Sequence, residues 1–134
     1  MNKIAAIDIG TNSVLYSLFD VSSGNKLREL YFARKSPRIG GGLYGKNRPV
    51  ISKECYLNLF VILSRFVRHA KRNRASTILL AATNPLRWAA NGKEIRAKLQ
   101  NDLGQEVRIL SPANEAHLSF LGAVGTLEKN QTAI

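Results

Sequence analysis

The first twenty residues contain two apolar runs of strand length separated by a short polar turn. Ile4 to Ile9 is apolar except for Asp8, and Val14 to Phe19 resumes an apolar pattern after the turn. Two such runs joined by four residues that include a glycine predict a β-hairpin. The chain is therefore expected to begin as an antiparallel sheet whose first turn is polar.

That first turn has the composition of an anion-binding site. Its backbone amides form a candidate nest for a phosphate group, with two hydroxyl side chains beside them, across Gly10, Thr11, Asn12 and Ser13. Gly10 also allows the backbone to bend sharply and to approach a ligand closely. Asp8 ends the preceding strand and is a candidate ligand for Mg²⁺ that bridges to a phosphate. An ordinary hairpin closed by an Asx-type turn has the same residues, so the turn alone leaves both interpretations open.

The rest of the chain alternates between helix and strand patterns. The first three strands, at about 3–9, 14–21 and 26–35, are separated by tight turns and form a meander. Two later strands are expected at 77–82 and 107–110. Helices are expected after Ser52, which can cap the first of them, from Asn91 to Gly104, and from about Ala113 to 127, with a short helical stretch after Arg87.

This order of elements predicts an α/β fold with a mixed five-stranded sheet. Three antiparallel strands extended by parallel crossover strands, in the order βββαβαβα with helices packed on the sheet, are typical of the ribonuclease-H-like lobe. The last residues, 131–134, resemble the approach to another strand. With 134 residues the chain is predicted to form a single lobe.

The charge balance indicates a polyanionic partner. Twenty Lys and Arg residues oppose nine Asp and Glu residues, which gives a net charge of +11. One cationic group follows a helical pattern and is explained equally well as a solvated helix end that favours the helix dipole; it comprises Arg65, Arg68, Lys71, Arg72 and Arg74. A second group flanks a glycine-rich loop and is the stronger candidate for polyanion contacts; it comprises Arg34, Arg38, Lys46 and Arg48.

Other features of the sequence limit the class of protein. No apolar run approaches the 18 or so residues of a membrane span, and no signal-peptide pattern follows Met1. Cys55 is the single cysteine, so no internal disulfide is possible. We expect a cytoplasmic protein that does not contact a membrane.

Four motifs, in order and over essentially the whole chain, resemble the exopolyphosphatase/guanosine pentaphosphate phosphatase family. This family belongs to the actin-like ATPase superfamily, which has the ribonuclease-H-like fold. The motifs are residues 6–13 (A-I-D-I-G-T-N-S), 38–43 (R-I-G-G-G-L), 82–87 (A-T-N-P-L-R) and 111–121 (S-P-A-N-E-A-H-L-S-F-L).

The resemblance implies a Mg²⁺-dependent hydrolysis of terminal phosphoanhydrides, with polyphosphate or guanosine pentaphosphate as substrate. It assigns Asp8 and the turn after it to the first phosphate loop. It gives Arg87 the role of holding a substrate phosphate through its guanidinium fork. It makes Glu115 the general base, while Mg²⁺ neutralises charge on the transferring group. Taken alone, Glu115 is also an ordinary acid near a helix N-terminus, and Arg87 an ordinary surface cation.

The sequence departs from the family pattern at several positions. The family usually has glycine at Pro112 and an acid at Asn114, so an altered loop is expected to present Glu115. It commonly has an acid at Gly41, and the loss of that acid makes the glycine-rich loop more basic. Its second phosphate loop, an aspartate followed by a glycine triplet, is expected directly after Ile134. We therefore expect residues 1–134 to be an N-terminal lobe that is inactive by itself and associates with a C-terminal lobe or a second copy.

Two other functions fit parts of the sequence. A polyanion-binding module without catalysis would need only the phosphate loop and the basic residues. A RuvC-like nuclease lobe opens with a similar D-I-G-T-N-S-V segment. Nuclease sites of that kind need two metals held by several carboxylates, however, and only Asp8 and Glu115 are expected near the site. Specific nucleic-acid binding is accordingly not expected.

Overall fold

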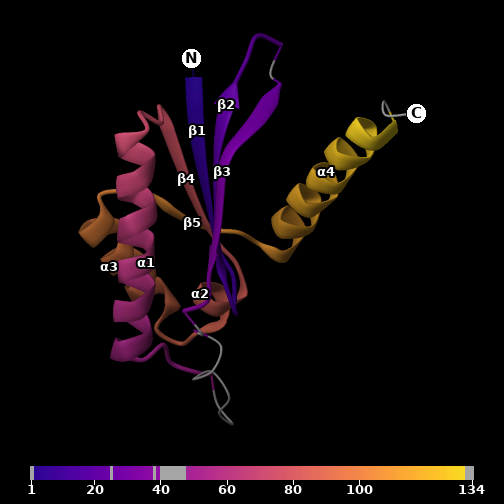
Figure 1. Cartoon of the computed structure of the whole chain (residues 1–134). Helices are drawn as coiled ribbons and strands as arrows, with labels where there is room; N and C mark the ends of the chain where they lie inside the picture. Colours follow the sequence, from indigo (N-terminus) through magenta and orange to yellow (C-terminus); the bar gives the residue numbers. More distant parts are fainter. Residues whose placement is uncertain (1, 25, 38, 40–47, 132–134) are drawn as a thin grey trace.

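The computed structural model describes residues 2–24, 26–37, 39 and 48–131. They form five strands and four helices around one sheet (Figure 1). The strands are β1 (Asn2–Ile9), β2 (Val14–Val21), β3 (Leu27–Lys35), β4 (Thr77–Ala82) and β5 (Val107–Ile109). The helices are α1 (Lys53–Arg72), α2 (Asn84–Trp88), α3 (Gly92–Leu103) and α4 (Pro112–Gln131).

The sheet is mixed and has the strand order β3-β2-β1-β4-β5. β1, β2 and β3 pair antiparallel, whereas β4 adds parallel to β1 and β5 adds parallel to β4. Tight turns can join only antiparallel neighbours, and the parallel strands are reached through α1 and through α2 with α3. The predicted fold class, an α/β lobe with a mixed five-stranded sheet, is confirmed.

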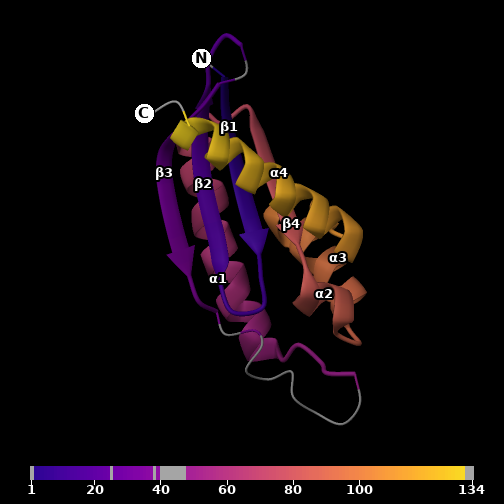
Figure 2. The same ribbon diagram turned by 90° about the vertical axis from the view of Figure 1, so that its right-hand side faces the viewer.

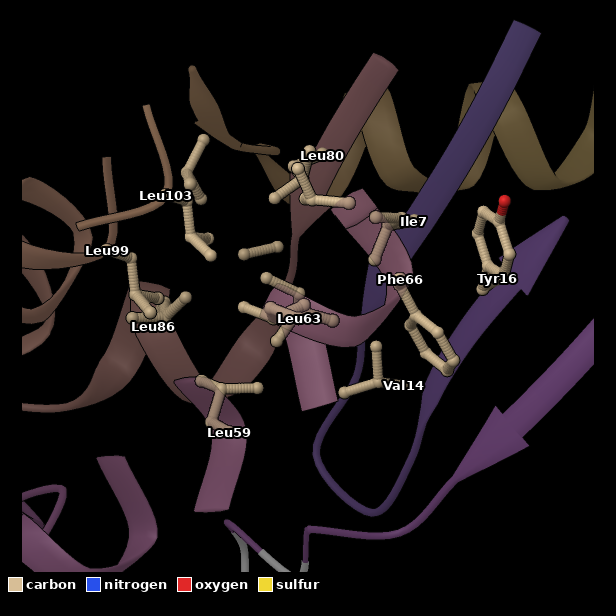
Figure 3. Close-up of a cluster of buried hydrophobic side chains, with 14 of the residues drawn as sticks. Ile7, Val14, Tyr16, Leu59, Leu63, Phe66, Leu80, Leu86, Leu99 and Leu103 are labelled. Carbon is tan, nitrogen blue, oxygen red and sulfur yellow. The ribbon is translucent and has the colours of Figure 1, made fainter. Parts of the chain in front are cut away.

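The core lies between the sheet and the helices α1 and α3. Alternate residues of β1 and β2 point to this face and are buried, as in Ile7 and Tyr16. α1 contributes an apolar stripe with helical spacing, of which Leu59, Leu63 and Phe66 are buried. Figure 3 shows these side chains meeting Leu80 of β4, with Leu86, Leu99 and Leu103 from α2 and α3 on the other side.

The two faces of the sheet are covered unequally. α1 and α3 lie on one face, and the chain crosses to the other face after β5, where α4 runs away from the sheet at an angle (Figures 1 and 2). Large apolar side chains on this second face keep much of their surface in solvent; Leu79 is 45% exposed and Phe32 is 54% exposed. No helix within the described residues is long and apolar enough to cross a bilayer.

Three helix ends lie where the sequence predicts them, but one of them forms without a side-chain capping bond. Ser52 caps α1 by accepting a hydrogen bond from the Cys55 amide at 3.1 Å. Gly104 ends α3 in the left-handed conformation, with φ at 61°. Asn91 precedes α3, but its side chain makes no capping bond. The side-chain amide of Asn91 instead accepts a hydrogen bond from the Ile51 N–H and donates one to the Ile51 carbonyl, both at 2.9 Å. These two bonds connect the segment before α1 to the start of α3.

The remaining differences concern element boundaries. The short helix α2 occupies Asn84–Trp88 and therefore includes Arg87, whereas the sequence placed it after that residue. Pro85 favours this earlier start, because proline fits the first turn of a helix. α4 continues to Gln131, the first residue of the strand expected at 131–134. The other residues of that expected strand, 132–134, lie outside the described part of the chain.

Candidate functional site

An open pocket of about 530 Å³ lies at the carboxyl ends of β1 and β4. Ligands of open α/β sheets bind at this edge, because the loops that leave parallel strands meet there. The pocket is lined by Asp8, Gly10, Thr11, Ala81, Thr83, Asn84, Leu110, Glu115, Leu118 and Ser119. Residues from both ends of the sequence therefore share one pocket.

Asp8 lies near the end of β1 and faces the side of the sheet opposite the core. Its neighbours Ile7 and Ile9 are buried under the helices, so alternation along the strand turns Asp8 toward the pocket. In the sheet it stands between Leu15 of β2 and Ala81 of β4. Burial raises the pKa of Asp8 above its usual value, and the negative charge of Glu115 raises it further. The two carboxylates therefore act on each other across the pocket.

The turn after β1 is closed by one backbone hydrogen bond. The Gly10 amide donates to the Ser13 carbonyl at 3.0 Å. A Cβ at position 10 would lie 3.0 Å from that carbonyl oxygen, so the close approach favours glycine. In the described part of the chain, the amides of Thr11, Asn12 and Ser13 donate to no protein acceptor. Thr11 lines the pocket, whereas the side chains of Asn12 and Ser13 do not.

Arg87 and Glu115 form an ion pair beside the pocket. The guanidinium Nη1 donates to Glu115 Oε2 at 3.1 Å and to the Leu110 carbonyl at 2.7 Å. The side chains are 27% and 40% exposed, so solvent and ligands can reach both. Arg87 itself is not among the residues that line the pocket, and both of these bonds come from its Nη1.

Glu115 is held by the first turn of α4. The Ser111 hydroxyl accepts a hydrogen bond from the Asn114 amide at 3.2 Å, and the Glu115 amide donates to the Ser111 carbonyl at 2.9 Å. Pro112 is the first residue of the helix, a position at which its missing N–H is harmless. The unusual residues at 112 and 114 thus leave a regular helix start that presents Glu115 to the pocket.

A model of the Ppx/GppA phosphatase family matches residues 20–134. The chain belongs to this family. A curated relative, exopolyphosphatase 2 of Mycobacterium tuberculosis, is 29% identical over 135 residues, which cover 95% of this chain and 42% of the relative. The chain thus spans less than half the length of that relative.

Solved structures of Ppx/GppA proteins share the fold. An exopolyphosphatase-like protein superposes with a TM-score of 0.80 at 24% identity, over 90% of this chain and 36% of that one. The Aquifex aeolicus Ppx/GppA phosphatase superposes with a TM-score of 0.76 at 20% identity, over 84% of this chain and 36% of that one. These structures have the actin-like ATPase fold, in agreement with the predicted architecture.

The donor groups of this Ppx/GppA pocket suit Mg²⁺. The described residues contain no cluster of three or more His, Cys, Asp or Glu side chains, as a cage made only of protein ligands would require. Mg²⁺ is usually bound by one or two carboxylates together with water and substrate phosphate oxygens. Asp8 and Glu115 supply two carboxylates, and Thr11 adds a hydroxyl oxygen at the same pocket.

The structure adds three polar residues that sequence reasoning did not assign to the site. Thr83 and Asn84 lie where β4 ends and α2 begins, and Ser119 lies one helical turn after Glu115. Thr83 and Asn84 belong to the family motif that contains Arg87, so the motif itself was a usable signal. No sequence pattern indicates that Ser119 lines the pocket, because its position there depends on the direction in which α4 leaves the sheet.

Of the basic residues predicted to contact polyanions, the structure describes two, and neither is part of the pocket lining. Arg34 and Arg48 are exposed, and neither lines it. Arg38 and Lys46 fall outside the described residues.

Proposed function

We propose that this chain is the phosphate-binding lobe of a Mg²⁺-dependent phosphatase that removes terminal phosphate from inorganic polyphosphate. The observation that carries the proposal is the shared pocket of Asp8, the turn at Thr11 and Glu115. It combines donors for a phosphate group with two carboxylates, one that could hold Mg²⁺ and one that could act as a base.

The terminal phosphate is held by backbone amides and by Arg87. The amides of Thr11, Asn12 and Ser13 have no protein acceptor and can donate to phosphate oxygens as a nest. Arg87 exchanges one partner, Glu115, for the incoming phosphate. The ion pair is partly exposed and so contributes less than about 1 kcal/mol, whereas a phosphate offers more charge and a bidentate geometry.

Release from Arg87 leaves Glu115 free to act as a base. Its carboxylate then orients and deprotonates a water molecule at the phosphorus centre, a role that typically accelerates a reaction by about 10²–10⁴-fold. Asp8 would hold Mg²⁺, which neutralises charge on the phosphoryl group when bound.

The pocket favours polyphosphate over guanosine pentaphosphate. Its lining contains no aromatic side chain among the described residues, so it offers no surface on which a guanine ring could stack. The name of the curated relative likewise refers to polyphosphate. Guanosine pentaphosphate is the alternative substrate.

The proposal assigns half of the active site to residues 1–134. A second lobe, joined to the chain or contributed by another copy, would add the second phosphate loop. Alone, the chain would bind phosphate groups and release little product. A binding role without catalysis predicts the same behaviour of the isolated chain, but it does not require Glu115 or Mg²⁺.

Calorimetric titration with tripolyphosphate tests this assignment. We expect Mg²⁺ to strengthen binding by tenfold or more, and Asp8→Asn to remove that gain because the metal loses its ligand. Glu94→Gln, which removes an exposed acid on α3, serves as the control and should keep the full Mg²⁺ effect. Equal Mg²⁺ effects in Asp8→Asn and the unchanged chain would contradict the proposal.

A further inference from the structure

The outer surface of α1 carries a row of cations that the proposed active site does not use. We call Arg65, Arg68, Lys71, Arg72 and Arg74 the α1 basic face; all five are exposed. Within the described residues none of them forms an ion pair. The ion pairs of the described residues are Asp20–Arg28, Asp102–Lys98, Glu106–Arg108 and Glu115–Arg87. Of these acids, Asp102 lines a pocket together with Arg68 and Lys71.

The spacing of these cations matches a linear polyanion. Arg65, Arg68 and Arg72 lie three and four residues apart, so they fall on one side of the helix and extend about 10 Å along its axis. Each guanidinium can bind phosphate oxygens through two parallel hydrogen bonds. Three arginines in a line therefore present evenly placed contacts to a chain of phosphates.

Arg74 is held in a conformation that is unfavourable for it. The helix ends with the Arg74 amide donating to the Lys71 carbonyl and the Ala75 amide donating to the Ala70 carbonyl, both at 3.0 Å. This ending puts Arg74 in the left-handed region, with φ at 59°. Glycine would remove a cost of about 1 kcal/mol at this position. An arginine here extends the cationic row beyond the end of the helix.

The helix dipole accounts for only part of this arrangement. Cations stabilise a helix when they lie in its last turn, where α1 has His69, Lys71 and Arg72. Arg65 and Arg68 precede that turn, and Arg74 follows the helix. A stabilising role at the helix end therefore leaves three of the five cations unexplained.

We propose that the α1 basic face binds a remote segment of the polyphosphate chain whose end occupies the active site; the proposal rests on the function proposed above. The face lies near the start of β1 and the pocket at its end, since Ser76 after α1 bonds to Lys3 whereas Asp8 lines the pocket. The face and the pocket also lie on opposite sides of the sheet, because α1 covers the core side whereas Asp8 faces the side of α4 (Figure 1). A chain that reaches both must therefore pass around the edge of the sheet, a path longer than β1 from residue 2 to residue 8, which is about 20 Å. Long polyphosphate can do so, and tripolyphosphate is too short.

The chemistry of the face favours polyphosphate over single-stranded nucleic acid. Proteins that bind single strands combine cations with exposed aromatic rings on which bases stack. The exposed apolar residues of α1 are Leu57 and Val61, which are aliphatic. Tyr31 of β3 reaches α1, but its ring packs on His69 with centroids 4.6 Å apart. The face thus offers contacts to phosphates and little to a base.

The test compares two triple variants that lose the same charge. Arg65→Gln/Arg68→Gln/Arg72→Gln changes the face, and Lys26→Gln/Lys53→Gln/Lys93→Gln removes three exposed cations elsewhere. Binding of tripolyphosphate and of polyphosphate several hundred units long is measured at 50 and 200 mM salt. Thermal unfolding checks that both variants are folded.

We expect the face variant to lose tenfold or more in affinity for long polyphosphate. The slope of log K against log salt should fall by about 2, or 0.7 for each of three lost phosphate contacts. Tripolyphosphate binding should change by less than twofold, and the control variant should bind long polyphosphate nearly as well as the unchanged chain.

Four outcomes would overturn the proposal. Equal losses in both triple variants would show that only net charge matters. Tighter binding of poly-uridylate RNA than of polyphosphate, with an equal loss in the face variant, would make the face a nucleic-acid surface. If tripolyphosphate binds normally and the face variant binds long polyphosphate as well as the unchanged chain does, only this proposal is contradicted. If the unchanged chain does not bind tripolyphosphate, the proposed function is contradicted as well.

Discussion

At the scale of single residues, the pair of Arg87 and Glu115 determines how the pocket receives an anion. Both side chains are partly exposed, and the pair is held at 3.1 Å with no further support from Glu115 to other described groups. In the proposed mechanism, the free protein keeps Glu115, the proposed general base, bound to Arg87, the proposed phosphate-binding arginine. Substrate binding and exposure of the base become one event.

Replacing Glu115 by Gln should separate binding from hydrolysis. The change removes a negative charge from the pocket and releases Arg87, so tripolyphosphate should bind about three- to tenfold tighter without Mg²⁺. Any phosphate release should fall by about 10²–10⁴-fold because the base is lost. Calorimetry and phosphate detection measure the two effects, with Glu94→Gln as the charge-matched control. Weaker tripolyphosphate binding by Glu115→Gln would contradict the proposal that Arg87 exchanges Glu115 for a substrate phosphate.

Tyr16 supports a prediction about stability at high pH. Its ring is fully buried, its hydroxyl is 2.8 Å from His69 Nδ1, and burial raises the pKa of Tyr16 to about 12. Between pH 10 and 12 the unfolded phenol ionises while the folded one stays neutral. Stability should therefore fall with rising pH in this window, by up to about 1.4 kcal/mol per pH unit.

Tyr16→Phe removes this contribution to the pH dependence. At pH 8 the variant should be about 1 kcal/mol less stable, because it lacks the hydrogen bond to His69. Toward pH 12 the difference should shrink and then reverse in sign, since the unchanged chain alone loses the contribution of Tyr16 and that loss exceeds about 1 kcal/mol. Urea unfolding at pH 8, 10, 11 and 12 measures both effects. If the free energies of unfolding of the two proteins change in parallel with pH, Tyr16 is not the cause of the loss of stability.

The residues of the site were predictable to different degrees. Asp8 and Gly10 stand out because a carboxylate and a glycine interrupt an apolar hairpin. Glu115 and Arg87 have ordinary surroundings in the sequence, and only the family motifs single them out. Ser119 had no signal, because its place in the pocket depends on the angle at which α4 leaves the sheet.

At the scale of helices and strands, periodicity predicted most of the fold and tertiary contacts decided the rest. Alternation defined β1 and β2, and the helical stripe and Ser52 defined α1. Asn91 precedes α3 as its local pattern predicts, but its side-chain amide bonds Ile51, which lies forty positions away, and does not cap the helix. A contact of that kind has no trace in a local pattern.

Gly92 should be intolerant of substitution for a reason that lies outside its own helix. A Cβ at position 92 would lie 1.9 Å from the Leu86 carbonyl oxygen, so α2 and α3 would have to separate. Gly92→Ala should cost about 3 kcal/mol, at the upper end of what overpacking costs. Urea unfolding measures the loss.

Gly122 of α4 provides the matched control for that change. A Cβ there meets nothing within 4 Å, and alanine favours a helix more than glycine does. Gly122→Ala should therefore leave stability unchanged or raise it by up to about 1 kcal/mol. Equal losses in the two variants would show that the contact between Gly92 and Leu86 is not the cause.

At the scale of the whole molecule, the chain combines a net charge of +11 with a pocket that holds two carboxylates. A net charge of +11 favours the approach of polyanions. The two carboxylates at the pocket repel a phosphate, so a phosphate can bind there only when a cation or free hydrogen-bond donors are present. The open apolar face of the sheet and the share of the curated relative that is matched, 42%, agree with a lobe that works beside another.

Residues 1–134 should accordingly release phosphate from polyphosphate only at a trace rate. A metal site with two carboxylates and a single phosphate loop binds the substrate but does not enclose it. Phosphate detection with Mg²⁺ and long polyphosphate measures the rate. Rapid phosphate release that is unchanged in Glu115→Gln would contradict two proposals: that residues 1–134 hold only half of the active site, and that Glu115 is the general base.

The most direct test of the central claim is a crystal structure of this chain with Mg²⁺ and tripolyphosphate. We predict a terminal phosphate within hydrogen-bond distance of the Thr11 amide, with Mg²⁺ between that phosphate and Asp8, and with Arg87 turned from Glu115 to a phosphate oxygen. Tripolyphosphate bound elsewhere, with the pocket filled by solvent and the Arg87–Glu115 pair intact, would contradict the account.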